Sequence, residues 1–291
     1  MSRITARRRV IRVTVGDSSV VQEDQLAVEE PLEIRVGGRP LAVTMRTPGH
    51  DFDLAAGFLV SEGVITRGEQ FSTVRYCAGA IEGSLNTYNI LDVTLAPGVA
   101  PPDASLERSF YTTSSCGLCG KASIDAVRTQ SAYDVRDDVL RIDAALLSTF
   151  PAKLRAEQVV FDKTGGLHAA GLFDGVSGDM LVIREDVGRH NAVDKVVGWA
   201  LKEGTLPLRG TVLMVSGRAS FELTQKAMMA GIPFLAAVSA PSSLAAEFAT
   251  EVGMTLVGFL RGSSMVMYAG SGRVVGAGSE RTRSGLGVAD S

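Results

Sequence analysis

The two cysteines of the segment Cys116-Gly-Leu-Cys119 are the residues whose type and spacing are best suited to chemistry. The chain holds three cysteines in all, with Cys77 standing alone, which is too few for a disulfide framework. In a reducing compartment such a pair indicates metal binding or thiol chemistry. Ser115 is placed to cap a following helix, and the positive helix end together with Lys121 would favour the thiolate of Cys116.

Three kinds of site use a Cys-x-x-Cys pair: half of a zinc site, a thioredoxin-like dithiol, and a sulfur carrier that holds a persulfide. Zinc needs about four ligands. No second pair accompanies the first, so we expect no metal site; the other candidate ligands are Cys77, His50, His168 and His190. A thioredoxin-like dithiol directly follows a strand, whereas this pair lies in a hydroxyl- and glycine-rich loop. Deaminase catalysis is excluded because His168-Ala-Ala lacks the required glutamate, although a deaminase-like fold is not.

The first part of the chain predicts a small α+β unit. Alternating apolar residues predict strands over 10–15, 32–45 and 88–95, the second of which turns at Gly37-Gly38. A helix is predicted over 51–63, and the three prolines of 96–102 end the pattern.

The second part predicts an α/β fold. Short apolar runs at 211–216, 234–238 and 255–260 alternate with helical patterns at 220–230 and 242–250, which is typical of strands covered on both faces of a mostly parallel or mixed sheet. Further strands are expected at 167–173 and 180–184 and a helix at 191–201. The predicted parts are a smaller N-terminal lobe (1–110), a mobile cysteine loop (111–122), an α/β lobe (123–277) and a disordered tail (278–291).

The carboxyl ends of the predicted parallel strands carry Gly, Ser and Arg, and such strand ends are where open α/β sheets bind ligands. Backbone donors and guanidinium groups suit a phosphate, so we expect an anion or nucleotide site there. Arg189, His190 and Asn191 open a helix and suit either phosphate binding or capping, while His168 is a ligand-proximal or core histidine. The candidate binding residues are Ser216, Gly217, Arg218, Ser239, Phe259, Leu260, Arg261, Gly262, Ser263, Ser264, His168, Arg189, His190 and Asn191.

Composition excludes several classes of protein. The 29 basic and 32 acidic residues give a net charge of −3, which argues against bulk nucleic-acid binding. No apolar run approaches the ~20 residues of a membrane helix, so we expect no membrane segment. The run Arg7 to Arg9 is followed by Arg12 and Gly16 rather than by an apolar stretch, so we expect a cytoplasmic protein without an export signal.

Several motifs together resemble the formate dehydrogenase accessory sulfurtransferase family, FdhD. They are Cys116-Gly-Leu-Cys119-Gly, Thr164-Gly-Gly-Leu-His168, Glu185-Asp-Val-Gly-Arg189-His-Asn191, Ser216-Gly-Arg218 and Gly258-Phe-Leu-Arg261. The resemblance implies a cytidine-deaminase-like α/β lobe with a smaller lobe, in a cytoplasmic homodimer.

The resemblance also implies an activity: sulfur transfer from a cysteine desulfurase to the molybdenum, or tungsten, of the bis(molybdopterin guanine dinucleotide) cofactor. The catalytic subunit of formate dehydrogenase would receive the matured cofactor. Cys116 matches the family's persulfide carrier and Cys119 its second cysteine. The segment 259–264 matches the guanine contact, so GDP is expected to act as a mimic of the bound cofactor.

A protein of a different class is a non-catalytic chaperone, which binds the cofactor or the apo-enzyme and uses its cysteines only for metal binding or docking. Replacing Cys116 separates the two, because a carrier loses maturation activity and a chaperone keeps it. An oxidoreductase would instead depend equally on Cys116 and Cys119.

Overall fold

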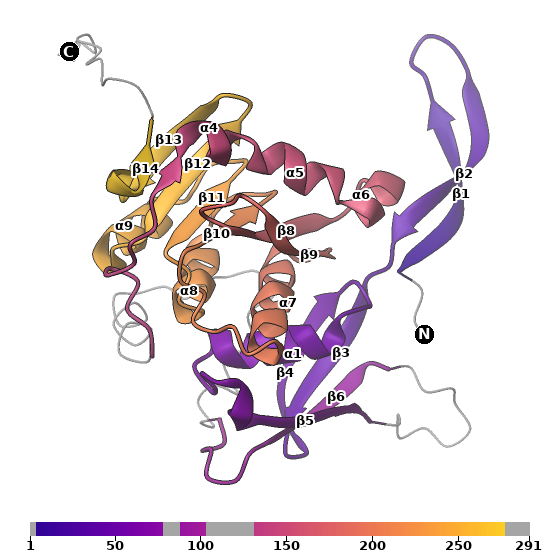
Figure 1. Ribbon diagram of the computed structural model, residues 1–291. Helices are drawn as coiled ribbons and strands as arrows, with labels where there is room; N and C mark the ends of the chain where they lie inside the picture. The colour runs from indigo at the N-terminus through magenta and orange to yellow at the C-terminus, as the bar shows by residue number, and fades with distance from the viewer. Residues whose placement is uncertain (1–3, 78–87, 103–130, 277–291) are drawn as a thin grey trace, which may run out of the picture.

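A six-stranded mixed sheet forms the centre of the computed structural model, which describes residues 4–77, 88–102 and 131–276 (Figure 1). The strand order is β13-β12-β11-β10-β8-β9. The strands are β8 (His168–Asp174), β9 (Met180–Asp186), β10 (Thr211–Val215), β11 (Phe234–Ala237), β12 (Thr255–Arg261) and β13 (Ser264–Ala269). Strands β10, β11 and β12 run parallel, whereas β8, β9 and β13 each pair antiparallel with a neighbour. The predicted α/β class with a mixed sheet is confirmed.

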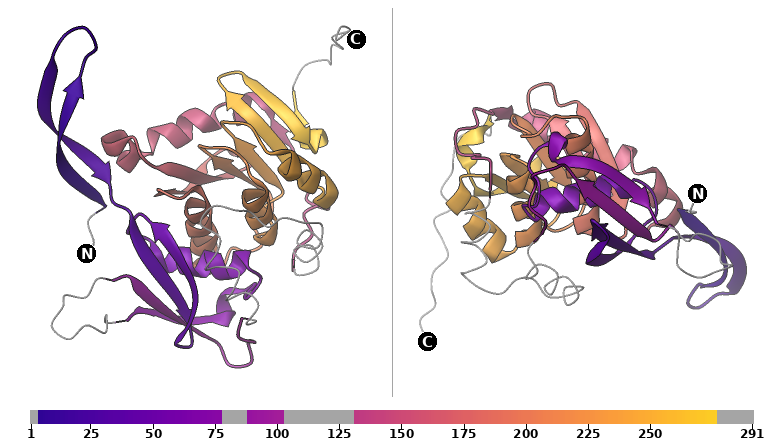
Figure 2. Two further views of the ribbon diagram at one scale, coloured as in Figure 1. Left: turned by 180° about the vertical axis from the view of Figure 1, so that it is seen from behind. Right: turned by 90° about the horizontal axis from the view of Figure 1, so that it is seen from below.

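Helices cover both faces of this sheet (Figures 1 and 2). One face carries α7 (Arg189–Lys202), α8 (Phe221–Met229) and α9 (Ser243–Val252). The other carries α5 (Phe150–Ala156), with the short helices α4 (Ala144–Ser148) and α6 (Val159–Thr164) on either side of it in the chain. Strand β10 is buried throughout, because its residues alternate between the two apolar clusters: Leu213 and Val215 in one, Val212 and Met214 in the other.

The N-terminal part forms a four-stranded sheet of order β4-β3-β6-β5. Its strands are β3 (Glu30–Val36), β4 (Arg39–Arg46), β5 (Phe71–Tyr76) and β6 (Ile90–Leu95). The predicted turn is present, since Gly37 and Gly38 both have positive φ, as a two-residue hairpin loop requires. The predicted helix is α1 (Asp51–Ser61).

The strand predicted over 10–15 belongs to a separate ribbon rather than to this sheet, and it ends earlier than expected. Strand β1 (Thr5–Val13) pairs only with β2 (Ser19–Ala27), and the chain turns at Thr14, whose carbonyl accepts from Asp17 N–H. The four-stranded sheet is also not purely antiparallel, because β3 and β6 run parallel.

The short elements η1 (Gly68–Gln70), β7 (Ile142–Asp143), η2 (Ser271–Arg273) and β14 (Val274–Val275) complete the structure, and β7 pairs with β14.

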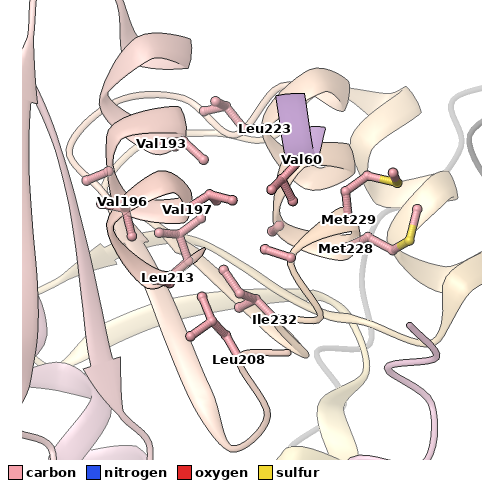
Figure 3. Close-up of a cluster of buried hydrophobic side chains, with 14 of the residues drawn as sticks. Val60, Val193, Val196, Val197, Leu208, Leu213, Leu223, Met228, Met229 and Ile232 are labelled. Atoms are coloured by element: carbon pink, nitrogen blue, oxygen red, sulfur yellow. The ribbon is translucent and has the colours of Figure 1, made fainter. Parts of the chain in front are cut away.

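One continuous apolar cluster joins α1 and the N-terminal sheet to α7, α8 and the central sheet. Figure 3 shows part of it, with Val60 of α1 beside side chains of α7 and α8. The methionines Met214, Met228, Met229 and Met254 are buried in the core. The division into lobes stays a prediction.

The cysteine loop 111–122, the predicted helix after it and the tail 278–291 lie outside the described residues. In the part of the chain that the structure describes, no helix is long and apolar enough to cross a bilayer.

Candidate functional site

The segments that follow β10, β11 and β12 meet at one edge of the central sheet. Ala219 and Pro241 form an isolated parallel bridge, and Ser242 N–H donates to Ala219 O at 3.0 Å. Phe259 N–H donates to Ser239 O at 3.2 Å. The predicted candidate segments are therefore neighbours, because three adjacent strands end at the same edge.

The amino end of β8 reaches the same edge, since β8 runs antiparallel to β10. Ser216 fixes this join: its Oγ accepts from Ala169 N–H at 2.9 Å, and its own N–H donates to Ala169 O at 3.0 Å. A Cβ on Gly217 would lie 3.3 Å from His168 Nδ1, so Gly217 allows the imidazole to lie against the loop. Ser216 and Gly217 thus place His168 at the edge of the sheet.

The imidazole of His168 is half-buried, and it faces positive charge. Burial lowers its pKa below the ordinary value, and the charges of Arg189 and His190 lower it further. His168 is therefore neutral at pH 7, with one ring nitrogen donating and one accepting.

The first turn of α7 contributes Arg189 and His190. Arg189 Nε is buried and has no hydrogen-bond partner among the described residues. A buried N–H of this kind is costly to leave unpaired, so an acceptor supplied by a ligand would stabilise it. Arg189 also lies at the start of α7, and the free backbone N–H groups of a helix N-terminus attract anions.

His190 faces α8 across the edge, where sequence reasoning missed a partner. His190 Nε2 lies 3.4 Å from Ser220 Oγ and 3.8 Å from Glu222 Oε2. The interaction with His190 lowers the pKa of Glu222 to about 2, despite the opposing effect of burial. The sequence signal was an acidic residue in the first turn of the helix after β10.

Asn191 lies close by but is engaged within the protein. Its Nδ2 donates to Met45 O at 2.8 Å and to Asp186 Oδ1 at 3.1 Å, and its Oδ1 accepts from Thr44 Oγ1 at 3.1 Å. These bonds tie α7 to β4. These contacts give Asn191 a role in positioning α7, and its binding of a ligand stays a prediction.

The predicted segment 259–264 is the hairpin between β12 and β13. Leu260 is fully buried in the core, so its side chain is turned away from the edge. Phe259 is 41% exposed and has a positive φ of 50°, a strained backbone for a bulky residue that turns its ring outward. Arg261 Nε donates to Val238 O at 2.9 Å, which holds the exposed guanidinium over the end of β11. Gly262 and Ser263 form the two-residue turn, and Ser264 begins β13.

The edge therefore combines the guanidinium groups of Arg189, Arg218 and Arg261, a neutral imidazole and an exposed aromatic ring. Such a set can hold phosphate and stack on a base. No group of acidic, histidine or cysteine side chains suited to a metal ion occurs within the described ranges. Cys116 and Cys119 lie outside these ranges.

Fold and site thus define an α/β protein with a cationic, aromatic edge at the carboxyl ends of its parallel strands. The chain belongs to the FdhD/NarQ family, whose model matches residues 27–275.

Curated relatives are similar over almost their whole length. A protein from Streptomyces avermitilis named sulfur carrier protein FdhD is 62% identical over 275 residues, which cover 94% of this chain and 97% of the relative. A protein of the same name from Mycobacterium tuberculosis is 57% identical over 277 residues, covering 94% of this chain and 100% of the relative.

A solved structure shares the fold. It is a protein from Desulfotalea psychrophila described as a putative formate dehydrogenase accessory protein, with a TM-score of 0.73 and 21% identity, and the match covers 94% of this chain and 100% of that chain.

Proposed function

We propose that the protein is a sulfur carrier that moves persulfide sulfur from a cysteine desulfurase to the metal of bis(molybdopterin guanine dinucleotide), and that it thereby matures a formate dehydrogenase in the cytoplasm. The observation that carries this proposal is the 62% identity, over 94% of the chain, to a protein named as a sulfur carrier. The pair Cys116 and Cys119 supplies the thiol chemistry that such a role needs.

Loading is a thiol exchange. The thiolate of Cys116 attacks the outer sulfur of the desulfurase persulfide, an S–S bond forms on Cys116, and the desulfurase cysteine leaves as a thiolate. The outer sulfur keeps its oxidation state, so loading needs no external oxidant or reductant. An accessible thiolate is the one requirement on Cys116.

Two routes of delivery are consistent with the cysteine pair. In the first, the outer persulfide sulfur bonds to the metal, the S–S bond breaks, Cys116 leaves as a thiolate, and the reduced cofactor supplies the two electrons that convert the transferred sulfur to sulfide. In the second, the thiolate of Cys119 attacks Cys116, hydrosulfide is released, and the two cysteines are left as a disulfide that must be reduced before the next cycle.

The strand edge is the proposed binding site for the guanine nucleotide ends of the cofactor. Arg189, Arg218 and Arg261 would meet phosphate, and the exposed ring of Phe259 offers a surface for a base. The unpartnered Nε of Arg189 supports this assignment, because phosphate oxygen is the kind of acceptor that it lacks. GDP carries both features and is the simplest probe of the site.

The test is mass spectrometry of the reduced protein after incubation with a cysteine desulfurase and cysteine. Wild type is compared with Cys116→Ala and Cys119→Ala, and the signal is a gain of one sulfur that dithiothreitol removes. We expect the gain on the peptide that contains Cys116 and its loss in Cys116→Ala. If no variant gains sulfur while GDP still binds, the protein is a cofactor-binding chaperone instead.

A further inference from the structure

A hollow of about 330 Å³ lies between the first turn of α1 and the last turn of α7, and side chains of β5 and β9 complete its lining among the described residues. Its volume falls within the range of about 300–1,000 Å³ that is usual for small-molecule sites. Arg189 and Lys202 are the first and last residues of α7, so a helix of 14 residues, about 20 Å long, separates this hollow from the strand edge. The hollow is therefore a second place where a ligand could bind.

Aromatic rings form the walls of this hollow. They belong to Phe52, Tyr76 and Trp199. The Tyr76 hydroxyl donates to Asp51 Oδ2 at 3.0 Å, and the Tyr76 ring lies 5.2 Å from that of Phe52. Asp51 is in turn held by the buried guanidinium of Arg46, whose Nη2 lies 2.9 Å from Asp51 Oδ2. Two of the three rings are thus held in place without a ligand, which lowers the entropy that binding costs.

The polar part of the lining holds two cations that share one carboxylate. Asp53 Oδ1 accepts from Lys202 Nζ at 2.8 Å, and Asp53 Oδ2 accepts from Arg184 Nε at 3.1 Å and from Nη2 at 2.9 Å. An ammonium has three N–H groups and a guanidinium five, so both cations keep donors after these bonds. The other acidic residue of the lining, Asp51, is paired with Arg46. One positive charge among the lining residues is therefore left without a counter-charge.

His50 lies at the rim of the hollow with an unusual backbone. It is the N-cap of α1, with a positive φ of 56°, and its side chain makes no capping hydrogen bond. Asparagine or glycine takes this conformation at lower cost, so capping does not explain a histidine here. Its Nδ1 lies 3.6 Å from Asp53 Oδ2. Partial burial lowers the pKa of His50, and the charge of Arg184 lowers it further by more than Asp53 raises it, so the field at the rim is positive.

We propose that this hollow binds a small aromatic carboxylate. The ring of the ligand packs against Trp199 and Phe52, and its carboxylate accepts from the remaining donors of Lys202 and Arg184. The single negative charge of the ligand balances the spare positive charge, so that two cations and two carboxylates form a neutral set. This binding site is separate from the strand edge and does not depend on the sulfur-carrier role.

The test is a fluorescence titration of the full chain, because Trp199 is the single tryptophan of the sequence and lines the hollow. The probe is phenylacetate, which carries both a ring and a charge, and we expect a saturable change in tryptophan emission. Phenethyl alcohol keeps the ring without the charge, and acetate keeps the charge without the ring. Each of these should bind about tenfold more weakly than phenylacetate, or weaker still. Equal affinity for phenylacetate and either control compound would overturn the assignment.

A matched pair of lysine variants locates the contact. Lys202→Met should weaken phenylacetate binding about tenfold and leave the binding of phenethyl alcohol unchanged, because it removes charge and no aromatic surface. Lys163→Met, the same change at an exposed position of α6, is the control and should bind phenylacetate as the wild type does. Circular dichroism confirms that each variant is folded. The assignment is wrong if phenylacetate gives no saturable change, if folded Lys202→Met binds it as the wild type does, or if GDP competes with it, which would place the probe at the strand edge.

Discussion

Gly57 of α1 and Gly198 of α7 lie against each other where the two helices cross. A Cβ on Gly57 would lie 1.8 Å from Asp194 O, and a Cβ on Gly198 would lie 1.8 Å from Asp53 O. Each helix therefore touches the backbone of the other at a position where it carries no side chain. This crossing joins the N-terminal part of the chain to the helix that carries Arg189 and His190.

Replacing either glycine with alanine should destabilise the protein severely. The added methyl group meets backbone, which cannot move aside as a flexible side chain can, so we expect Gly57→Ala and Gly198→Ala each to lower the free energy of unfolding by about 3 kcal/mol or more. Urea denaturation measures the change. Gly272→Ala is the control: no atom lies within 4 Å of its added Cβ and its φ is not positive, so its effect should stay within about 0.5 kcal/mol. Equal stability of all three variants would contradict the close crossing.

Lys195, in the middle of α7, forms a buried ion pair with Asp186, the last residue of β9. Their side chains are 1% and 0% exposed, and Nζ lies 2.7 Å from Oδ2. Lys195→Met leaves the Asp186 carboxylate buried without its cation, so the free energy of unfolding should fall by about 3–5 kcal/mol. The matched control is Lys202→Met, seven residues further along α7. That lysine is 43% exposed and its partner Asp53 keeps Arg184, so the expected loss is about 0–1 kcal/mol. A larger loss for Lys202→Met than for Lys195→Met would refute this ranking.

Glu222 should make the stability of the folded protein depend on pH in the acid range. Its pKa is lowered to about 2 in the folded protein from an ordinary 4.5, so the folded state binds its proton less readily than the unfolded state. The stabilisation is fully present above pH 4.5 and is lost as the pH falls towards 2. The melting temperature of Glu222→Gln should thus lie below that of the wild type at pH 6, and the two should converge near pH 2 to 3. A constant difference at all pH values would rule out the proposed contact with His190.

The elements that were predicted correctly are those with strong local signals. The apolar run of β10 and the helical patterns of α8 and α9 can be recognised from the sequence alone. Strand β2 was missed because Ser19–Ala27 carries four consecutive polar residues from Gln22 to Gln25 and has no buried face to impose alternation. The short helices α4 to α6 were also missed, since brief helices form through tertiary packing more than through propensity.

The direction of the strands could not be predicted from their composition. Strands buried on both faces have continuous apolar runs whether they are parallel or antiparallel, so β8 reads much like β11. The same limit applied to the site. That β8 runs antiparallel to β10 is what places His168 beside Gly217, and Glu222 became a partner of His190 only once α7 and α8 lay side by side.

Arg218 and Arg209 test the strand edge directly, because they flank the same strand at opposite ends. Both side chains are exposed, Arg218 just after β10 and Arg209 just before it. If the guanine nucleotide binds at the carboxyl edge, Arg218→Ala removes a charge-assisted contact to phosphate and should weaken GDP binding by about tenfold, or ~1.4 kcal/mol. Isothermal titration calorimetry measures the affinity. Arg209→Ala makes the same change in net charge at the amino edge and should bind GDP as the wild type does. Equal weakening by both variants would show that GDP senses only the overall charge, and a loss confined to Arg209→Ala would move the site to the other end of the sheet.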